Sequence, residues 1–172
     1  MFLSLEAVEA LFAPWQALYG DSTIIPIAVT ALHLMGMLIG GGLAIGADRS
    51  TLRISHEVPG ERDRHLGELN AIHRPVMMAL SLLFVTGLAM LASDIATFLV
   101  SPVLWIKLGL VALLVINGVV LERTETALRR RGREGVRDSS SDLWPRLRIA
   151  AMLSIFLWLA TLVAGTTLVS AA

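Results

Sequence analysis

Residues 23–47 form an apolar stretch without a single charged side chain, and this stretch limits the possible folds more than any other feature. A helix needs about 20 mostly apolar residues to cross the hydrocarbon core of a bilayer. The composition agrees, because a chain of 172 residues with 55% hydrophobic and only 16% charged residues is unlike an ordinary soluble domain. We therefore predict a transmembrane helix over residues 23–47 and a single membrane domain over residues 1–172.

Three further apolar stretches are predicted to cross the membrane, at residues 75–92, 102–121 and 146–169. Pro75 and Pro102 suit the first turn of a helix, where the N–H that proline lacks would have no partner in any case. Residues 61–72 are predicted to form a short separate helix, and residues 97–101 a brief link. The predicted fold class is all-α, an integral membrane four-helix bundle.

The segment before the first span, residues 5–19, places apolar side chains at helical spacing and includes Trp15 and Tyr19. This pattern predicts an N-terminal amphipathic helix in the membrane interface, which Pro14 bends or ends early. Packing on the outer rim of the bundle is an equally good interpretation. The segment lacks the basic start and the small-residue cleavage site of a signal peptide, so we expect it to stay on the mature protein.

The basic residues are distributed very unevenly along the chain. Of the 14 lysines and arginines, five lie in the connection 48–74, eight lie in the connection 122–148, and one is Lys107. Because basic loops are retained in the cytoplasm, both connections are predicted to be cytoplasmic, with both termini and the link at Asp94 outside. The formal net charge is zero, so no nucleic-acid partner is expected. The chain has no cysteine, which excludes disulfides and thiolate metal sites.

His33 lies near the middle of the first predicted span, beside two GxxxG spacings, Gly36/Gly40 and Gly42/Gly46. Such glycine faces let another helix or a flat ligand approach the backbone closely. A polar ring is retained in hydrocarbon only for a reason, and two interpretations remain open. Either His33 binds a metal or cofactor, or it is a neutral imidazole that hydrogen-bonds a hydroxyl or amide group on a neighbouring helix.

Polar residues also follow one stripe of the third predicted span and one stripe of the fourth. The stripes comprise Lys107, Leu110, Leu114 and Asn117, and Ser154, Trp158, Thr161 and Gly165. Polar stripes on lipid-bounded helices are predicted to face inward, so His33, Lys107 and Asn117 could meet inside the bundle. Alternatively, Lys107 extends to the outer surface beside Trp105.

The other three histidines, His56, His65 and His73, lie in the first basic connection. Their spacing matches no zinc motif, so they are interpreted as solvated loop residues. The methionines are interpreted as ordinary filler of an apolar bundle rather than as copper ligands.

The four predicted spans resemble a family of small bacterial four-helix membrane proteins. That family is similar in turn to the copper resistance protein D group and to the haem-containing protoporphyrinogen oxidase of bacteria. The resemblance covers nearly the whole chain from about residue 25. Its most specific parts are the first-helix histidine and two motifs. These are His33, the P…TG motif (Pro75, Thr86, Gly87) and the W-x-K-L motif (Trp105, Lys107, Leu108). The resemblance implies the inner membrane of a bacterium, so the termini that the charge distribution places outside are expected to be periplasmic.

The resemblance further implies a b-type haem held in the bundle, with His33 as an axial ligand to the iron. The second face of the iron is then open or bound by a weaker ligand, and the glycine face of the first helix admits the flat macrocycle. The candidate cofactor contacts are His33, Met37, Gly40, Met90, Trp105, Lys107 and Asn117.

The role expected from this resemblance is redox chemistry or electron transfer with an unidentified redox partner, which makes the chain a candidate membrane oxidoreductase. Two alternatives from other classes remain open. One is a non-enzymatic assembly or accessory subunit, and the other is a permeation protein for copper or small solutes. The expected surroundings are the lipid bilayer, with a homo-oligomer or a larger membrane complex as the expected assembly.

Overall fold

The computed structural model describes residues 5–54, 60–133 and 142–171. These residues form helices and no β-strand, so the all-α prediction is confirmed. The elements are α1 (Leu5–Asp21), α2 (Ile24–Arg53), α3 (Glu61–Ser93), α4 (Ile95–Val100), α5 (Pro102–Arg133) and α6 (Leu143–Ala171). Within the described part, four helices, α2, α3, α5 and α6, are long and apolar enough to cross a membrane, so the chain is a multi-pass membrane protein.

The membrane helices are longer than the predicted spans. α3 has 33 residues, which corresponds to about 50 Å at 1.5 Å per residue and exceeds the hydrocarbon core of about 30 Å. Pro75 lies inside α3, so the prediction that it begins a helix is wrong. The proline removes one backbone hydrogen bond, but Leu66 and Leu69 in the preceding turns are buried, and this packing holds the helix together across it.

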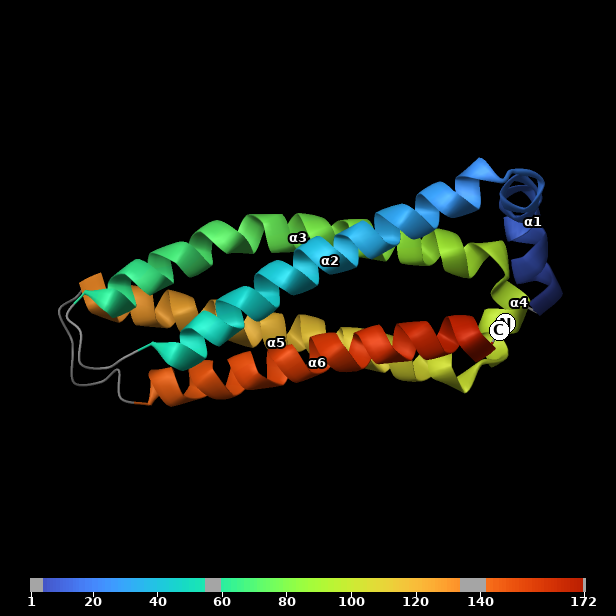
Figure 1. Ribbon diagram of the computed structural model, residues 1–172. Coiled ribbons are helices and arrows are strands. Elements are labelled where there is room, and N and C mark those ends of the chain that lie inside the picture. Colours follow the sequence, from blue (N-terminus) through green and yellow to red (C-terminus); the bar gives the residue numbers. More distant parts are fainter. Residues whose placement is uncertain (1–4, 55–59, 134–141, 172) are drawn as a thin grey trace.

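The two short helices lie at the end of the bundle that also carries both chain termini (Figure 1). α1 continues through Pro14, and its Trp15 donates a hydrogen bond from Nε1 to the backbone oxygen of Ala89 in α3 at 2.9 Å. α4 occupies most of the predicted link, and Asp94 caps it by accepting a hydrogen bond from the Thr97 N–H at 3.3 Å. The expected link is therefore a capped helical turn, and α1 is docked on the bundle.

The four long helices pack as two antiparallel pairs, α2 with α3 and α5 with α6 (Figure 1). The pairs are joined mainly by α2 against α6, whereas α3 and α5 touch only slightly. One cluster of buried side chains lies near the ends of the helices that adjoin the two long connections: Ile54, Leu66, Leu69, Leu128, Trp144 and Leu147. A second cluster, formed by Leu114, Leu157 and Trp158, lies deeper in the bundle.

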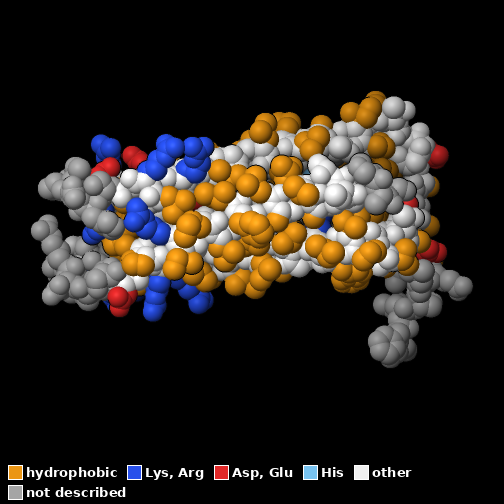
Figure 2. Space-filling view, turned by 60° about the horizontal axis from the view of Figure 1, so that its bottom comes forward, with side chains coloured by type: hydrophobic (Ala, Val, Ile, Leu, Met, Phe, Trp, Pro, Cys, Tyr) orange, Lys and Arg blue, Asp and Glu red, His pale blue; other side chains and the backbone are white. Residues whose placement is uncertain are grey.

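Basic side chains gather at the end of the bundle opposite the termini (Figure 2). We call this the arginine-rich end; it carries Arg53, Arg62, Arg130 and Arg148, among others. Arg62 stacks over the ring of Trp144 at 5.0 Å, and Arg148 donates to the Leu52 backbone oxygen at 2.8 Å. Hydrophobic side chains are numerous along the rest of the face shown in Figure 2, as a lipid environment requires.

Glycines of α2 set the distance between the central helices. A Cβ atom on Gly40 would lie 2.9 Å from the Cβ of Ala79 in α3, and a Cβ on Gly41 would lie 3.2 Å from the Trp158 ring in α6. By contrast, Cβ atoms on Gly42 and Gly46 would meet no described atom within 4 Å. The first GxxxG spacing therefore packs helices inside the chain, and the second does not.

We predict that Gly40→Ala destabilises the bundle by about 1–3 kcal/mol, because the added methyl group forces α2 and α3 apart. Gly42→Ala is the matched control on the same helix, where the added methyl group meets open space and helix propensity improves by up to about 1 kcal/mol. Thermal unfolding in detergent measures both. Equal melting temperatures for the two variants would contradict this packing.

Candidate functional site

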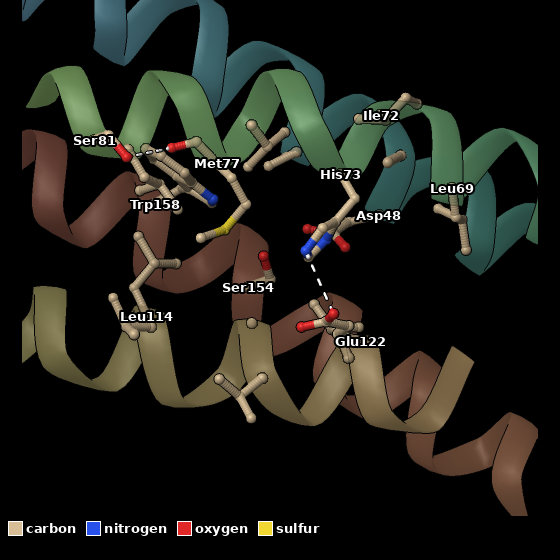
Figure 3. A pocket seen from close by; sticks show the side chains of 18 of the residues that line it. Asp48, Leu69, Ile72, His73, Met77, Ser81, Leu114, Glu122, Ser154 and Trp158 are labelled. Carbon is tan, nitrogen blue, oxygen red and sulfur yellow. Dashed lines mark hydrogen bonds and ion pairs between the residues drawn. The ribbon is translucent and has the colours of Figure 1, made fainter. Parts of the chain in front are cut away.

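A cavity of about 460 Å³ lies along the line where α3 and α5 fail to close against each other (Figure 3). Its wall on α3 extends from Leu69 to Val85, which is about 24 Å at 1.5 Å per residue. α5 forms the opposite wall, and Ser154 and Trp158 of α6 contribute to the lining. A cavity of this volume is in the range of sites for small molecules.

The long side of the cavity opens toward the lipid. Five of its lining side chains are large, apolar and exposed on the surface of the bundle, namely Met77, Phe84, Val85, Val115 and Val119. In a membrane-spanning region, such exposed surface faces acyl chains rather than water. A ligand would therefore enter sideways from the bilayer, between α3 and α5.

The charged groups of the cavity gather at its arginine-rich end, whereas the Ser81 hydroxyl lies further along α3 and donates to the Met77 backbone oxygen at 3.0 Å. Asp48 of α2, His73 of α3 and the pair Glu122 and Glu125 of α5 line this end together with Ser154. His73 and Glu122 point toward each other across the gap, with 3.7 Å between Nε2 and Oε1 (Figure 3). The cavity thus has a polar end near the membrane surface and an apolar end deeper in the hydrocarbon.

His33 lies outside this cavity and contacts the TG motif of α3. His33 Nδ1 and the Thr86 hydroxyl oxygen form a hydrogen bond of 2.8 Å, and the Leu82 backbone oxygen, 2.7 Å from the same hydroxyl, favours the tautomer in which His33 Nδ1–H is the donor. The prediction of a hydrogen bond to a hydroxyl on a neighbouring helix is therefore confirmed. In this tautomer Nε2 keeps its lone pair, so the donor chemistry fits a metal ligand.

The glycine face next to His33 is already filled. Gly36 lies against Leu83, Gly40 against Ala79 and Gly41 against Trp158. These contacts join α2 to α3 and α6, and they do not provide the flat opening that was expected for a macrocycle. The residues therefore fit one iron ligand but not the glycine cradle for a haem.

The other candidate cofactor contacts are divided between separate places. The Lys107 ammonium lies 3.4 Å from where a Cβ of Gly165 would be, so Lys107 faces α6. Asn117 is buried and donates to the Ala150 backbone oxygen at 2.9 Å, about 15 Å further along α5. Its expected meeting with His33 and Lys107 is therefore wrong, because its amide joins α5 to α6.

The remaining candidates lie at the edges of the His33 region. Trp105 is 59% exposed and donates to the Leu99 backbone oxygen at 3.0 Å, a contact near the terminal end of the bundle. Met37 follows His33 by one turn, Met90 follows Thr86 by one turn, and both are partly exposed. Within the described residues, no group of His, Asp or Glu has the arrangement of a metal site.

The histidines interpreted as solvated loop residues lie on α3 instead. His65 is only 5% exposed, and its Nε2 lies 2.9 Å from the Thr51 hydroxyl of α2. His73 lines the cavity, and His56 lies outside the described residues. The error arose because the predicted break between residues 61–72 and the second span does not exist.

Sequence reasoning missed the carboxyl groups of the cavity. Asp48, Glu122 and Glu125 were assigned to the basic connections, where charged residues are ordinarily solvated. The helices continue past the apolar spans and carry these residues back into the bundle. The spacing of three residues between Glu122 and Glu125, which puts both on one helix face, was the available signal.

The comparisons with known proteins give no family for this chain. No protein-family model, no curated protein and no solved structure matches it. The resemblance to the copper resistance protein D group therefore stays a prediction, and the functional proposal depends on the geometry alone.

Proposed function

We propose that this chain is a membrane-embedded binding protein for a lipid-soluble small molecule, held in the cavity between α3 and α5. The observation that carries the proposal is the polarity of the cavity along the membrane normal. Its charged groups lie at the arginine-rich end, and the rest of its wall is apolar apart from the Ser81 hydroxyl and opens toward lipid. A molecule with a polar head and an apolar body is complementary to that arrangement.

This proposal keeps the small-solute ligand of the permeation alternative but replaces permeation with binding. It needs no continuous polar path across the bundle, because a lipid-soluble ligand reaches the cavity through the bilayer. It also gives a reason for the weak contact between α3 and α5, since full closure would bury the half-exposed side chains of His73 and Glu122 against apolar side chains.

We further propose that the arginine-rich end faces the cytoplasm and that both termini lie outside, in the periplasm of a bacterial inner membrane. The positive-inside rule supports this orientation, because 13 of the 14 basic residues belong to the two connections at that end. The polar end of the cavity is then at the cytoplasmic surface.

Binding of haem b at His33, with a redox or electron-transfer role, is a second proposal. The favouring observation is the hydrogen bond from His33 to Thr86, which fixes the ring and leaves Nε2 available. The haem would need space on the Nε2 side, since the glycine face is filled. The cavity between α3 and α5 is a poor alternative for it, because carboxyl groups line the end where propionates would be placed.

A photoreactive, uncharged diazirine derivative of an alkylbenzene tests the cavity. We expect saturable labelling of peptides that contain Met77 and Val115, which an excess of unlabelled compound suppresses. Gly118→Leu should remove this labelling, because Gly118 lines the cavity and its Cβ position is open. Gly109→Leu is the matched control, an equally open glycine of α5 outside the lining. Labelling that never saturates, or that both variants retain, would contradict the proposed site.

The orientation is testable because the chain has no cysteine of its own. Val100→Cys on the exposed face of α4 should react with a membrane-impermeant maleimide in cells with a permeable outer membrane. Arg130→Cys at the arginine-rich end should react only after lysis. The reverse pattern would show that the assigned orientation is inverted.

The haem proposal predicts a Soret band in protein purified from haem-supplied cells. His33→Ala should abolish the band while the protein stays folded, and Thr86→Val should lower haem affinity about 10- to 100-fold by removing the acceptor of Nδ1–H. His73→Ala should keep the band, because His73 lies about 20 Å from Thr86 along α3. Colourless wild-type protein would refute this second proposal.

A further inference from the structure

The polar end of the cavity brings together acidic groups from two helices. Asp48 belongs to α2, Glu122 and Glu125 belong to α5, and the charge of Glu125 interacts with both of the others. Carboxyl groups that line one cavity repel one another when ionised, and the burial of Asp48 strengthens the repulsion on it because the local dielectric constant is low. Such an arrangement is favourable when a positive charge lies among the carboxyl groups.

Asp48 is the member of this cluster whose surroundings are incomplete. Its residue is 5% exposed, yet its Oδ2 atom has no hydrogen-bond partner among the described residues. A buried polar atom without a partner costs about 1–3 kcal/mol, and more when it is charged. Because Asp48 lines the cavity, a ligand placed there would supply the missing partner.

The described lining of the cavity offers little positive charge to these carboxyl groups. It contains no lysine or arginine, and His73, 3.7 Å from Glu122, is its one basic side chain. Arg129 interacts with Glu125 from the same helix, and it is not among the residues that line the cavity. The three carboxyl groups therefore outnumber the cationic groups that face the cavity.

The apolar part of the cavity indicates what kind of body the ligand has. The aromatic side chains of Phe84 and Trp158 line it together with aliphatic side chains. Aromatic faces attract organic cations as well as apolar bodies. An anionic amphiphile, such as a fatty acid, would place its carboxylate against Asp48, Glu122 and Glu125, so charge repulsion disfavours that class.

We propose that the cavity selects a lipid-soluble organic cation, with an ammonium head beside Asp48, Glu122 and Glu125 and an apolar body between α3 and α5. This inference rests on the proposed binding function and adds the charge of the ligand to it. Ion pairs in this partly buried setting favour a cation over an uncharged molecule of the same shape by about tenfold or more in affinity.

The experiment compares two photoreactive diazirine probes that share one alkylbenzene body, one with a trimethylammonium head and one with a hydroxyl head. Both are applied to the full chain in nanodiscs of uncharged lipid, and labelling of peptides with Met77 and Val115 is measured by mass spectrometry. We expect the cationic probe to reach half-saturation at a concentration at least about tenfold lower.

Charge-removing variants identify the groups responsible for this preference. Asp48→Asn and Glu122→Gln should each reduce the advantage of the cationic probe several-fold while labelling by the hydroxyl probe persists. Glu122 is the safer position, because its side chain is 55% exposed and its replacement leaves the buried packing intact. Glu68→Gln, which removes an exposed carboxyl group outside the cavity, should leave the preference unchanged.

The outcomes separate this inference from the proposed function. Equal saturable labelling of the cavity by both probes would overturn the inference and leave the binding function standing. An advantage of the cationic probe that survives in both Asp48→Asn and Glu122→Gln would also overturn it. Absence of saturable labelling by either probe would refute the binding function itself.

Discussion

The close contact of α2 with two neighbours is the constraint on which the rest of this bundle depends. Gly40 brings α2 against Ala79 of α3, and Gly41 brings it against Trp158 of α6. Because α3 and α6 are both drawn against α2, the remaining side of the bundle, between α3 and α5, is left with little contact. The cavity is thus a consequence of where the glycines are, and its position is set by packing elsewhere.

The parts of the fold that depend on hydropathy and backbone chemistry could be predicted from the sequence. The uncharged stretch around His33 indicates a membrane helix, and the polar stripe that includes Ser154 and Trp158 faces inward as expected. Helix ends could not be predicted as well, because Pro75 and the charged residues beyond each span suggest breaks. Packing of Leu66 and Leu69 against other helices overrides those local signals.

In the candidate site, too, some features could be predicted from the sequence and others could not. The hydrogen bond of His33 could be anticipated, because a polar ring in hydrocarbon needs a partner and the TG motif of α3 supplies one. The carboxyl groups of the cavity could not be found in this way. Asp48 and Glu122 are assigned to solvated connections unless one already knows that their helices continue and that α3 and α5 stay apart. Their meeting depends on tertiary structure, which spacing along the sequence does not record.

The two polar regions of the bundle differ in what they lack. His33 has its hydrogen bond to Thr86 and is satisfied without any ligand, whereas Asp48 is buried with an unpartnered oxygen beside an open volume. A polar group buried without a hydrogen-bond partner destabilises a membrane protein, and residues that carry such a group are usually functional. This difference is why the space between α3 and α5, rather than the surroundings of His33, is proposed as the main site.

Occupancy of that space is tested most directly by anomalous diffraction from crystals grown in a lipid phase with a bromine-labelled, lipid-soluble ammonium compound. The predicted result is a bromine peak between α3 and α5, near Met77, Val115 and Trp158, with the ammonium head beside Asp48 and Glu122. A structure in which α3 and α5 close against each other, or in which bromine lies only on the outer lipid-facing surface, would contradict it.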